Sequence, residues 1–125
     1  MRTFSFEKLM VWQKSRTLAV LIYKTTKAFP ADERFGLISQ MRRCTVSIAS
    51  NLAEGTGRHS NIDKARFTEI AYSSALELLN QAIIANDLKH LTDEHYQNIR
   101  TSINEITAML DGLRKSQLNA KSLNS

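Results

Sequence analysis

Histidine and cysteine are the residue types of this chain best suited to metal or nucleophilic chemistry, and they are few. The sequence holds His59, His90, His95 and a single cysteine, Cys44. The nearest match to a metal motif is one Asp87-x-x-His90 pair, whereas a di-metal helical bundle needs two Glu-x-x-His pairs and two further glutamates. We interpret the pair as charges at a helix end, and we expect neither a metal nor a cofactor.

The candidate nucleophiles also lack catalytic partners. Cys44 lies on an apolar helical face with no histidine nearby in the sequence, which is typical of a small buried core residue. Ser47, Ser73 and Ser74 fall inside predicted helices without a nucleophile-elbow motif. The sequence therefore predicts that the chain is not an enzyme.

Residues 54–61 are the best candidate for phosphate binding. They read Glu-Gly-Thr-Gly-Arg-His-Ser-Asn. Glycines let the backbone approach a ligand closely, and the start of the following helix attracts anions. The candidate nucleic-acid contacts around this segment are Arg58, His59, Lys64 and Arg66. The alternative is an ordinary turn with solvated charges, because the segment contains neither phosphate-binding glycine motif, GxxxxGK[ST] or GxGxxG.

Arg42 and Arg43 complete the candidate nucleic-acid contacts. Because they are adjacent, one of the two should face inward or along an interface. Glu54 and Glu77 are candidate partners for Arg42, and a buried ion pair would hold the register of the helices. We favour the alternative of solvent-facing charges, because a buried charge is costly unless it is well paired.

The positive charge is concentrated in the first half of the chain. The net charge is +5, and residues 34–66 hold six basic and two acidic side chains, whereas residues 67–125 hold five basic and seven acidic ones. If several chains assemble symmetrically, the basic segment is repeated and its weak phosphate contacts add up. Binding to nucleic acid should then weaken steeply with salt.

Apolar periodicity predicts the elements that position these residues. Spacings of three and four residues indicate helices over about residues 7–28, 32–55, 61–89 and 93–116. The predicted core stripes are Leu9, Trp12, Ala19, Ile22 and Thr26 in the first helix, Ile38, Met41, Thr45, Ile48 and Leu52 in the second, Phe67, Ile70, Ala71, Ser74, Leu78, Ala82 and Ala85 in the third, and Tyr96, Ile99, Ile103, Ile106, Leu110 and Leu113 in the fourth.

Length and composition agree with one helical domain. The chain has 125 residues, 42% of them hydrophobic, with one proline and four glycines, which are too few turn-formers for a sandwich or barrel. The single cysteine excludes an internal disulfide. We predict an all-α fold, an antiparallel up-down-up-down four-helix bundle over residues 1–116, followed by a flexible tail over residues 117–125.

The helices hold more apolar residues than one bundle core requires. A soluble bundle helix needs a single apolar stripe, and the surplus here indicates either a broad stripe that packs on two neighbours or a surface buried between subunits. The candidate subunit-interface residues are Trp12, Val20, Leu37, Leu79 and Ile83.

The sequence shows no signal peptide and no membrane-spanning segment, which indicates the cytoplasm. The first residues lack the apolar core of a signal peptide, and the longest strongly apolar run, residues 18–23, is far shorter than the roughly 20 residues of a membrane-spanning helix. The free thiol suits a reducing compartment. We expect a cytoplasmic protein with no membrane partner.

Four sequence segments together resemble one known family. Residues 6–16 read FEKLMVWQKSR, residues 33–43 read ERFGLISQMRR and residues 47–55 read SIASNLAEG, and they are joined by Phe67 to Ala71, Ser74 and Glu77-Leu78. Over residues 6–116 the chain resembles the bacterial four-helix-bundle proteins encoded in intervening sequences of 23S ribosomal RNA genes. His59 and Asn61 depart from the more basic or serine-rich loop of that family, which weakens the charge argument at this loop.

The resemblance implies an assembly and a class of partners. It implies that the chain is an antiparallel bundle that forms a homopentamer. The chain is also similar to the accessory protein of diversity-generating retroelements, a pentameric bundle that binds nucleic acid and a reverse transcriptase. Our first hypothesis is a non-enzymatic homo-oligomer whose basic surface binds RNA or DNA. The alternative is a protein-interaction adaptor or ribosome-associated scaffold that holds a ribosomal or reverse-transcriptase-like protein without contacting nucleic acid.

Overall fold

The computed structural model describes residues 1–124, with side chains as far as residue 120, and within that range the chain is helical and has no strand. The elements are η1 (Ser5–Lys8), α1 (Met10–Thr26), η2 (Ala31–Glu33), η3 (Arg34–Ile38), α2 (Ser39–Thr56), α3 (Asn61–Asp87) and α4 (Asp93–Asn124). The predicted all-α class with four main helices is confirmed.

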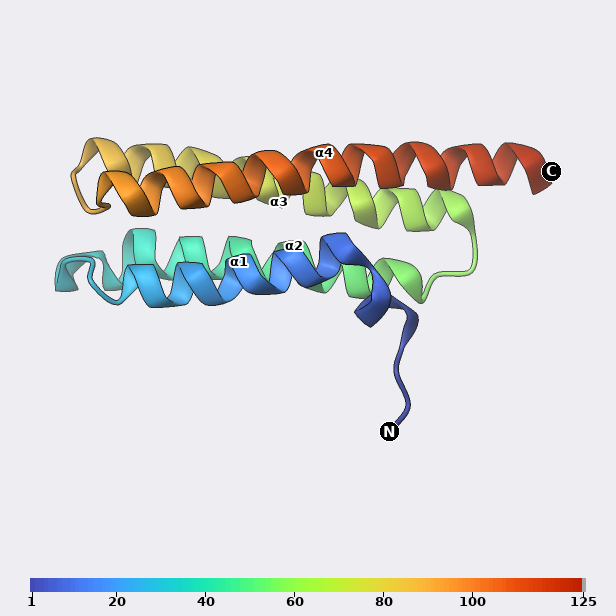
Figure 1. Ribbon diagram of the computed structural model, residues 1–125, viewed down its shortest axis with the longest axis horizontal. Helices are drawn as coiled ribbons and strands as arrows, with labels where there is room; N and C mark the ends of the chain where they lie inside the picture. Colours follow the sequence, from blue (N-terminus) through green and yellow to red (C-terminus); the bar gives the residue numbers. More distant parts are fainter. Residues whose placement is uncertain (125) are drawn as a thin grey trace.

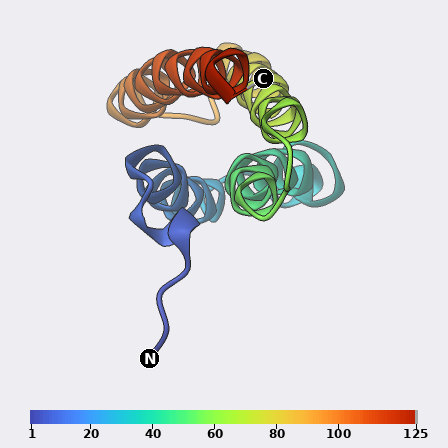
Figure 2. The ribbon, with the colours of Figure 1, turned by 90° about the vertical axis from the view of Figure 1, so that its right-hand side faces the viewer.

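The four long helices form a bundle of two layers. α1 and α2 lie side by side in one layer, and α3 and α4 lie in the other (Figure 2). The α1–α2 and α3–α4 connections lie at one end of the bundle, and the α2–α3 connection lies at the other (Figure 1). Around the bundle, each helix packs against the helix before it and the helix after it, and α4 also packs against α1.

The first two helices are shorter than the apolar periodicity predicts. Residues 5–8 form a 3-10 turn, in which the backbone N–H of Phe4 donates to Glu7 Oε2 at 2.8 Å, so α1 begins only at Met10. After Pro30 the chain makes a 3-10 turn and a π-helical turn, and Gly36 has φ −106° and ψ −113°. Because those angles are not helical, α2 begins at Ser39 rather than near residue 32.

The predicted core of the last three helices is largely correct. Met41, Ile48 and Leu52 of α2 are buried, and so is the central stripe of α4 from Ile99 to Leu110. In α3 the buried positions are mostly alanines, and Ile70, which we placed in the core, is exposed. The small side chains of α3 let α2 and α4 pack closely on either side of it.

The predicted face of α1 is partly wrong. Val11 and Leu18 are 4% and 1% exposed, although the predicted core stripe of this helix leaves them out. The helix is turned so that Ser15 faces the core and Arg16 faces solvent. The Ser15 hydroxyl donates to the Val11 carbonyl oxygen at 2.7 Å, so the core accepts this polar group without leaving its hydrogen bond unmade.

α4 continues without a break past residue 116 to Asn124. Beyond residue 116, the Thr68 hydroxyl of α3 lies 2.8 Å from Gln117 Oε1. Ser125, and the side chains of residues 121–125, lie outside the described part of the chain. The flexibility of residues 117–125 stays a prediction.

Candidate nucleic-acid interface

The α2–α3 connection is a short, internally bonded turn. At the end of α2, the N–H groups of Gly57 and Arg58 donate to the carbonyl oxygens of Glu54 and Gly55 at 3.1 Å. At the start of α3, the Ser60 hydroxyl accepts a hydrogen bond from the Asp63 N–H at 3.1 Å and so caps the helix. The turn therefore holds residues 58–60 in exposed positions at the end of the bundle.

Gly55 does not serve the role that the sequence suggested. It lies buried inside α2, and a Cβ added there would lie 2.9 Å from the Cβ of Phe67. This glycine lets α2 and α3 approach each other, and it leaves no backbone open for a ligand. Gly57 is the C-cap of α2.

Basic residues lie on the three elements that meet at this end of the molecule, η1, the α2–α3 connection and the start of α3, and we call this set the basic end: Lys8, Arg58, His59, Lys64 and Arg66. The Arg58 guanidinium stacks 4.5 Å from the Phe67 ring centroid, and Arg66 Nη1 lies 3.9 Å from Asp63 Oδ1. Neither Lys8, His59 nor Lys64 has an anionic partner among the side chains that the structure describes. The cations of Lys8 and Lys64 are therefore free to contact phosphates.

Lys8 is the residue that sequence reasoning missed. It lies about fifty positions before the other members, in the 3-10 turn η1. A shallow hollow lined by Ser5, Leu9, Thr56, Asn61 and Lys64 shows that this turn folds against the α2–α3 end. The proximity is a tertiary contact, so no local pattern in the sequence signals it.

Arg42 and Arg43 do not join the basic end. Sixteen residues separate Arg42 from Arg58, or about 24 Å along a helix. Instead of the carboxylates that we considered, Arg42 binds the end of α1. Its Nε donates to Thr26 Oγ1 at 3.0 Å, its Nη2 donates to the Tyr23 carbonyl oxygen at 3.2 Å, and its guanidinium lies 4.7 Å from the Tyr23 ring centroid. Arg43 is exposed.

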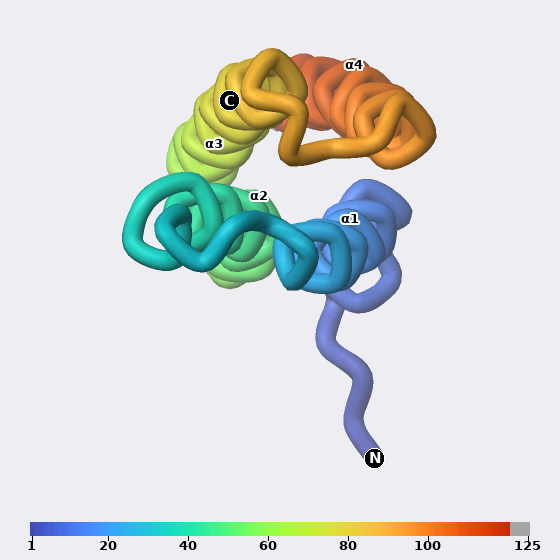
Figure 3. Tube along the Cα trace, turned by 90° about the vertical axis from the view of Figure 1, so that its left-hand side faces the viewer, coloured from blue at the N-terminus to red at the C-terminus, as the bar shows by residue number. Residues whose placement is uncertain are grey.

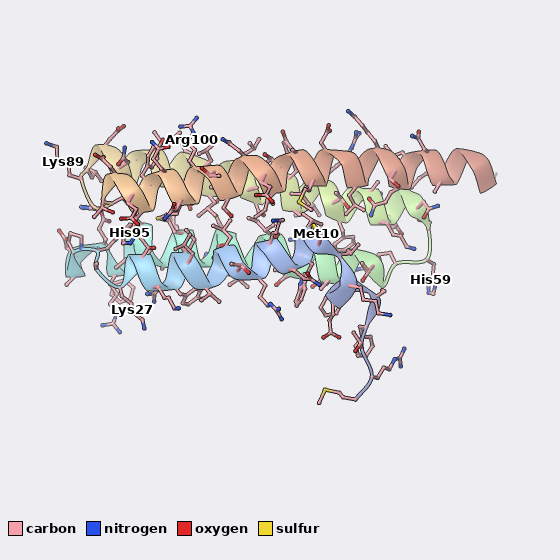
Figure 4. The ribbon with its side chains drawn as sticks, in the orientation of Figure 1. Met10, Lys27, His59, Lys89, His95 and Arg100 are labelled. Atoms are coloured by element: carbon pink, nitrogen blue, oxygen red, sulfur yellow. The ribbon has the colours of Figure 1, made fainter. Side chains whose placement is uncertain are left out.

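The opposite end of the bundle carries the opposite balance of charge. His59 lies at one end, and Lys27, Lys89 and His95 lie at the other (Figure 4). Residues 5–8 and 54–66 together hold four lysines and arginines and three acids, whereas residues 27–38 and 87–95 together hold three lysines and arginines and five acids. At this end His90 Nε2 contacts Glu33 Oε2 at 3.0 Å. The bundle is thus polarised along its length.

Residues 7–112 match the family of 23S rRNA-intervening sequence proteins. The chain belongs to this family. A protein of unknown function from the S23 ribosomal protein family of Bacteroides thetaiotaomicron VPI-5482, solved by crystallography at 1.70 Å, is similar to it, with a TM-score of 0.77 and 27% identity over 85% of this chain and 99% of that one. No curated protein matches this chain. The resemblance identified from the sequence motifs is confirmed.

Cys44 of this family member lies in a polar seam between α2 and α3. It is buried, as predicted, and its thiol donates to Glu77 Oε2 at 3.2 Å and accepts from Gln81 Nε2 at 3.4 Å. Burial, and then the hydrogen bond to the Glu77 carboxylate, raise the pKa of the Cys44 thiol to about 11. A thiol held protonated in this way is a poor nucleophile.

The described residues show two further features relevant to function. They contain no group of three or more His, Cys, Asp or Glu side chains that could hold a metal ion. No helix among them is long and apolar enough to cross a membrane.

The candidate interface residues occupy different environments. Trp12, Leu37 and Leu79 are half-buried against the core, Ile83 is half-buried, and Val20 is exposed. The apolar surplus on the surface is therefore made largely by other residues. The exposed large apolar side chains of α3 are Ile62, Ile70, Tyr72, Leu76 and Ile84.

Proposed function

We propose that this chain is a non-enzymatic, cytoplasmic four-helix bundle of antiparallel, up-down-up-down order that self-associates, as a homopentamer, and binds RNA or DNA through its basic end. The observation that carries the proposal is that Lys8, Arg58 and Lys64, which have no ion pair among the described side chains, lie on the elements that meet at one end of a bundle whose other end is acidic. Its membership in the 23S rRNA-intervening sequence family is consistent with a nucleic-acid partner.

Self-association matters for the binding because one basic end is small. A single chain offers three or four cations to phosphates, and each phosphate contact is individually weak and screened by salt. A cyclic assembly places identical ends on the same side of the particle. Several basic ends then contact one nucleic acid together, which raises the affinity without any new type of contact.

Two variants of equal charge test the basic end. The first, Lys64→Gln/Arg66→Gln, removes two cations from the basic end, and the second, Arg34→Gln/Lys89→Gln, removes two from the opposite end. Filter binding of structured RNA and duplex DNA at 50–200 mM salt should show an affinity about tenfold lower for the first variant and a shallower dependence on salt. The second should bind like the wild type.

Either of two results would overturn nucleic-acid binding through this end. One is a wild-type chain that binds neither RNA nor DNA in a salt-dependent manner at 50 mM salt. The other is an equal loss of affinity in both variants, which would show that only net charge matters.

The exposed apolar face of α3 supports a second candidate, an adaptor for a ribosomal or reverse-transcriptase-like protein. In that case the face is covered by a different protein and the free chain is monomeric. Light scattering separates the two functions, because the self-associating bundle has a multiple of the 14.2 kDa chain mass and the free adaptor does not.

A further inference from the structure

The outer face of α1 carries a stripe that is cationic at its ends and apolar between them. Arg16, Val20, Tyr23 and Lys27 follow one another at spacings of four, three and four residues, with Lys24 beside them. They line a shallow hollow formed mainly by apolar atoms. Val20 is 50% exposed, and α1 contains no acidic residue at all. We call these five residues the α1 stripe.

The outer face of α3 carries the converse pattern, made by Leu76, Glu77, Ile84, Asp87 and Leu88, which we call the α3 stripe. Leu76, Ile84 and Leu88 are 48%, 43% and 52% exposed. Residues 67–88 include no lysine or arginine. No ion pair to Glu77 or Asp87 exists among the described side chains, and the one contact to Glu77 is the Cys44 thiol.

The two stripes match in length as well as in charge. Eleven positions separate Arg16 from Lys27, and ten separate Glu77 from Asp87. At about 1.5 Å per residue, both pairs of charges are roughly 15–17 Å apart. The apolar side chains Val20 and Tyr23 lie between the cations, and Ile84 lies between the acids. Packed side by side, the stripes would bury apolar surface and place each acid near a cation.

Within one chain the two stripes cannot meet. α1 and α3 lie at diagonally opposite corners of the bundle, with α2 and α4 between them (Figure 3). Their outer faces therefore point away from each other, and the α1 stripe can contact an α3 stripe only on another molecule.

We propose that the α1 stripe of one copy packs against the α3 stripe of the next copy. This inference rests on the proposed self-association and names the two surfaces that form it. Such an interface is heterologous, because each copy contributes two different faces, and it forms a closed ring if the rotation between copies closes and an open filament if it does not.

Charge exchange tests the pairing. Arg16→Glu/Lys27→Glu reverses the cations at both ends of the α1 stripe, and Glu77→Lys/Asp87→Lys reverses the two acids of the α3 stripe. Each pair alone places like charges against each other, so light scattering should show a fall from the wild-type assembly to the 14.2 kDa chain mass. All four substitutions in one chain restore opposite charges and should restore the assembly.

A control variant separates this inference from nucleic-acid binding. Lys8→Glu/Lys64→Glu changes the net charge as much as the α1 pair but lies on the basic end, so it should keep the wild-type mass and lose affinity for RNA and DNA. Circular dichroism establishes that each variant is folded.

The outcomes distinguish the two proposals. If the wild type assembles and neither pair of charge substitutions changes the mass of the assembly, the pairing of the two stripes is wrong, but self-association still holds. The same holds if folded variants dissociate and the fourfold variant does not recover. A monomeric wild type overturns both.

Discussion

One glycine sets the distance between α2 and α3. A Cβ at Gly55 would lie 2.9 Å from the Phe67 Cβ, whereas a Cβ at Gly112, in α4, would meet no atom within 4 Å. We expect Gly55→Ala to lower the free energy of unfolding by about 1–3 kcal/mol through overpacking. Gly112→Ala should raise it by roughly 0.5–1 kcal/mol, because alanine is the better helix former.

Urea unfolding followed by circular dichroism measures both alanine variants. The chain concentration must be equal in all samples, because association adds to apparent stability. A Gly55→Ala protein as stable as the wild type would contradict the close approach of the two helices.

The Cys44 thiol should show its raised pKa in its reactivity. Because the thiolate is the reactive form and the pKa is about 11, the alkylation rate of the folded protein should keep rising up to about pH 11. In the urea-unfolded chain it should level off near pH 8.5, the ordinary value. Iodoacetamide labelling followed by mass spectrometry measures both profiles, and a folded-state rate that levels off below pH 9 would contradict the prediction.

The same shift has a consequence for stability. A thiol whose folded-state pKa is raised favours the folded protein while it is protonated in both states. That contribution is complete below the unfolded pKa near 8.5 and is lost as the pH rises toward 11. The difference in unfolding free energy between wild type and Cys44→Ala should therefore change over this interval and be constant below it.

At the scale of single residues, the sequence predicted types of environment better than partners. The burial of Cys44, for example, follows from its position on an apolar helical face. The partners of Arg42 and the nearness of Lys8 to the α2–α3 turn depend on which helices meet. Those contacts join residues far apart in the chain, and periodicity carries no information about them.

At the scale of elements, the α1–α2 connection depends on a contact from the α3–α4 connection, which lies at the same end of the bundle in the other layer. Glu33 Oε2 contacts His90 Nε2 at 3.0 Å, and Glu33 Oε1 accepts a hydrogen bond from the Leu37 N–H at 3.4 Å. The His90 ring also packs 5.4 Å from the Phe29 ring, centroid to centroid. These contacts hold the π-helical turn that replaces the expected start of α2.

We expect His90→Ala to release this connection. Loss of the hydrogen bond to Glu33 and of the ring contact should lower the free energy of unfolding by about 1 kcal/mol. The backbone amide of Leu37 should exchange with solvent faster, because its acceptor is no longer held in place. Hydrogen–deuterium exchange measures the second effect. His95→Ala, at an exposed position of α4, is the control, and equal exchange in both variants would contradict the role of His90.

The predictability of the elements follows from the regularity of their stripes. α4 matches its prediction because Ile99, Ile103, Ile106 and Leu110 repeat without a polar interruption. α1 has apolar residues on several faces, so its periodicity fits more than one rotation, and the observed one puts Leu18 in the core and Arg16 in solvent. The break at Gly36 depends on φ and ψ angles that no neighbouring residue type dictates.

At the scale of the whole molecule, charge separates in two directions. Along the bundle, a basic end opposes an acidic end, and across it, the cationic α1 stripe opposes the acidic α3 stripe. The first arrangement supports phosphate binding and the second supports association between copies. The sequence predicted neither charged surface, although it did show that the basic residues are in excess in the first half of the chain.

If both proposals hold, association and nucleic-acid binding must be coupled. Leu76→Gln/Ile84→Gln weakens the α3 stripe without changing any charge and leaves every residue of the basic end in place. A dissociated chain uses one basic end, so its plot of log affinity against log salt concentration should have a slope no steeper than about −3. The assembly should show a steeper slope.

Filter binding on samples whose mass is known from light scattering measures this slope. Met10→Gln/Val46→Gln, which replaces two exposed apolar residues outside both stripes, is the matched control and should keep the wild-type mass and slope. Equal slopes for the dissociated variant and the assembled wild type would show that each chain binds nucleic acid alone. The basic ends would then not act together, and self-association would need a reason other than multiplying phosphate contacts.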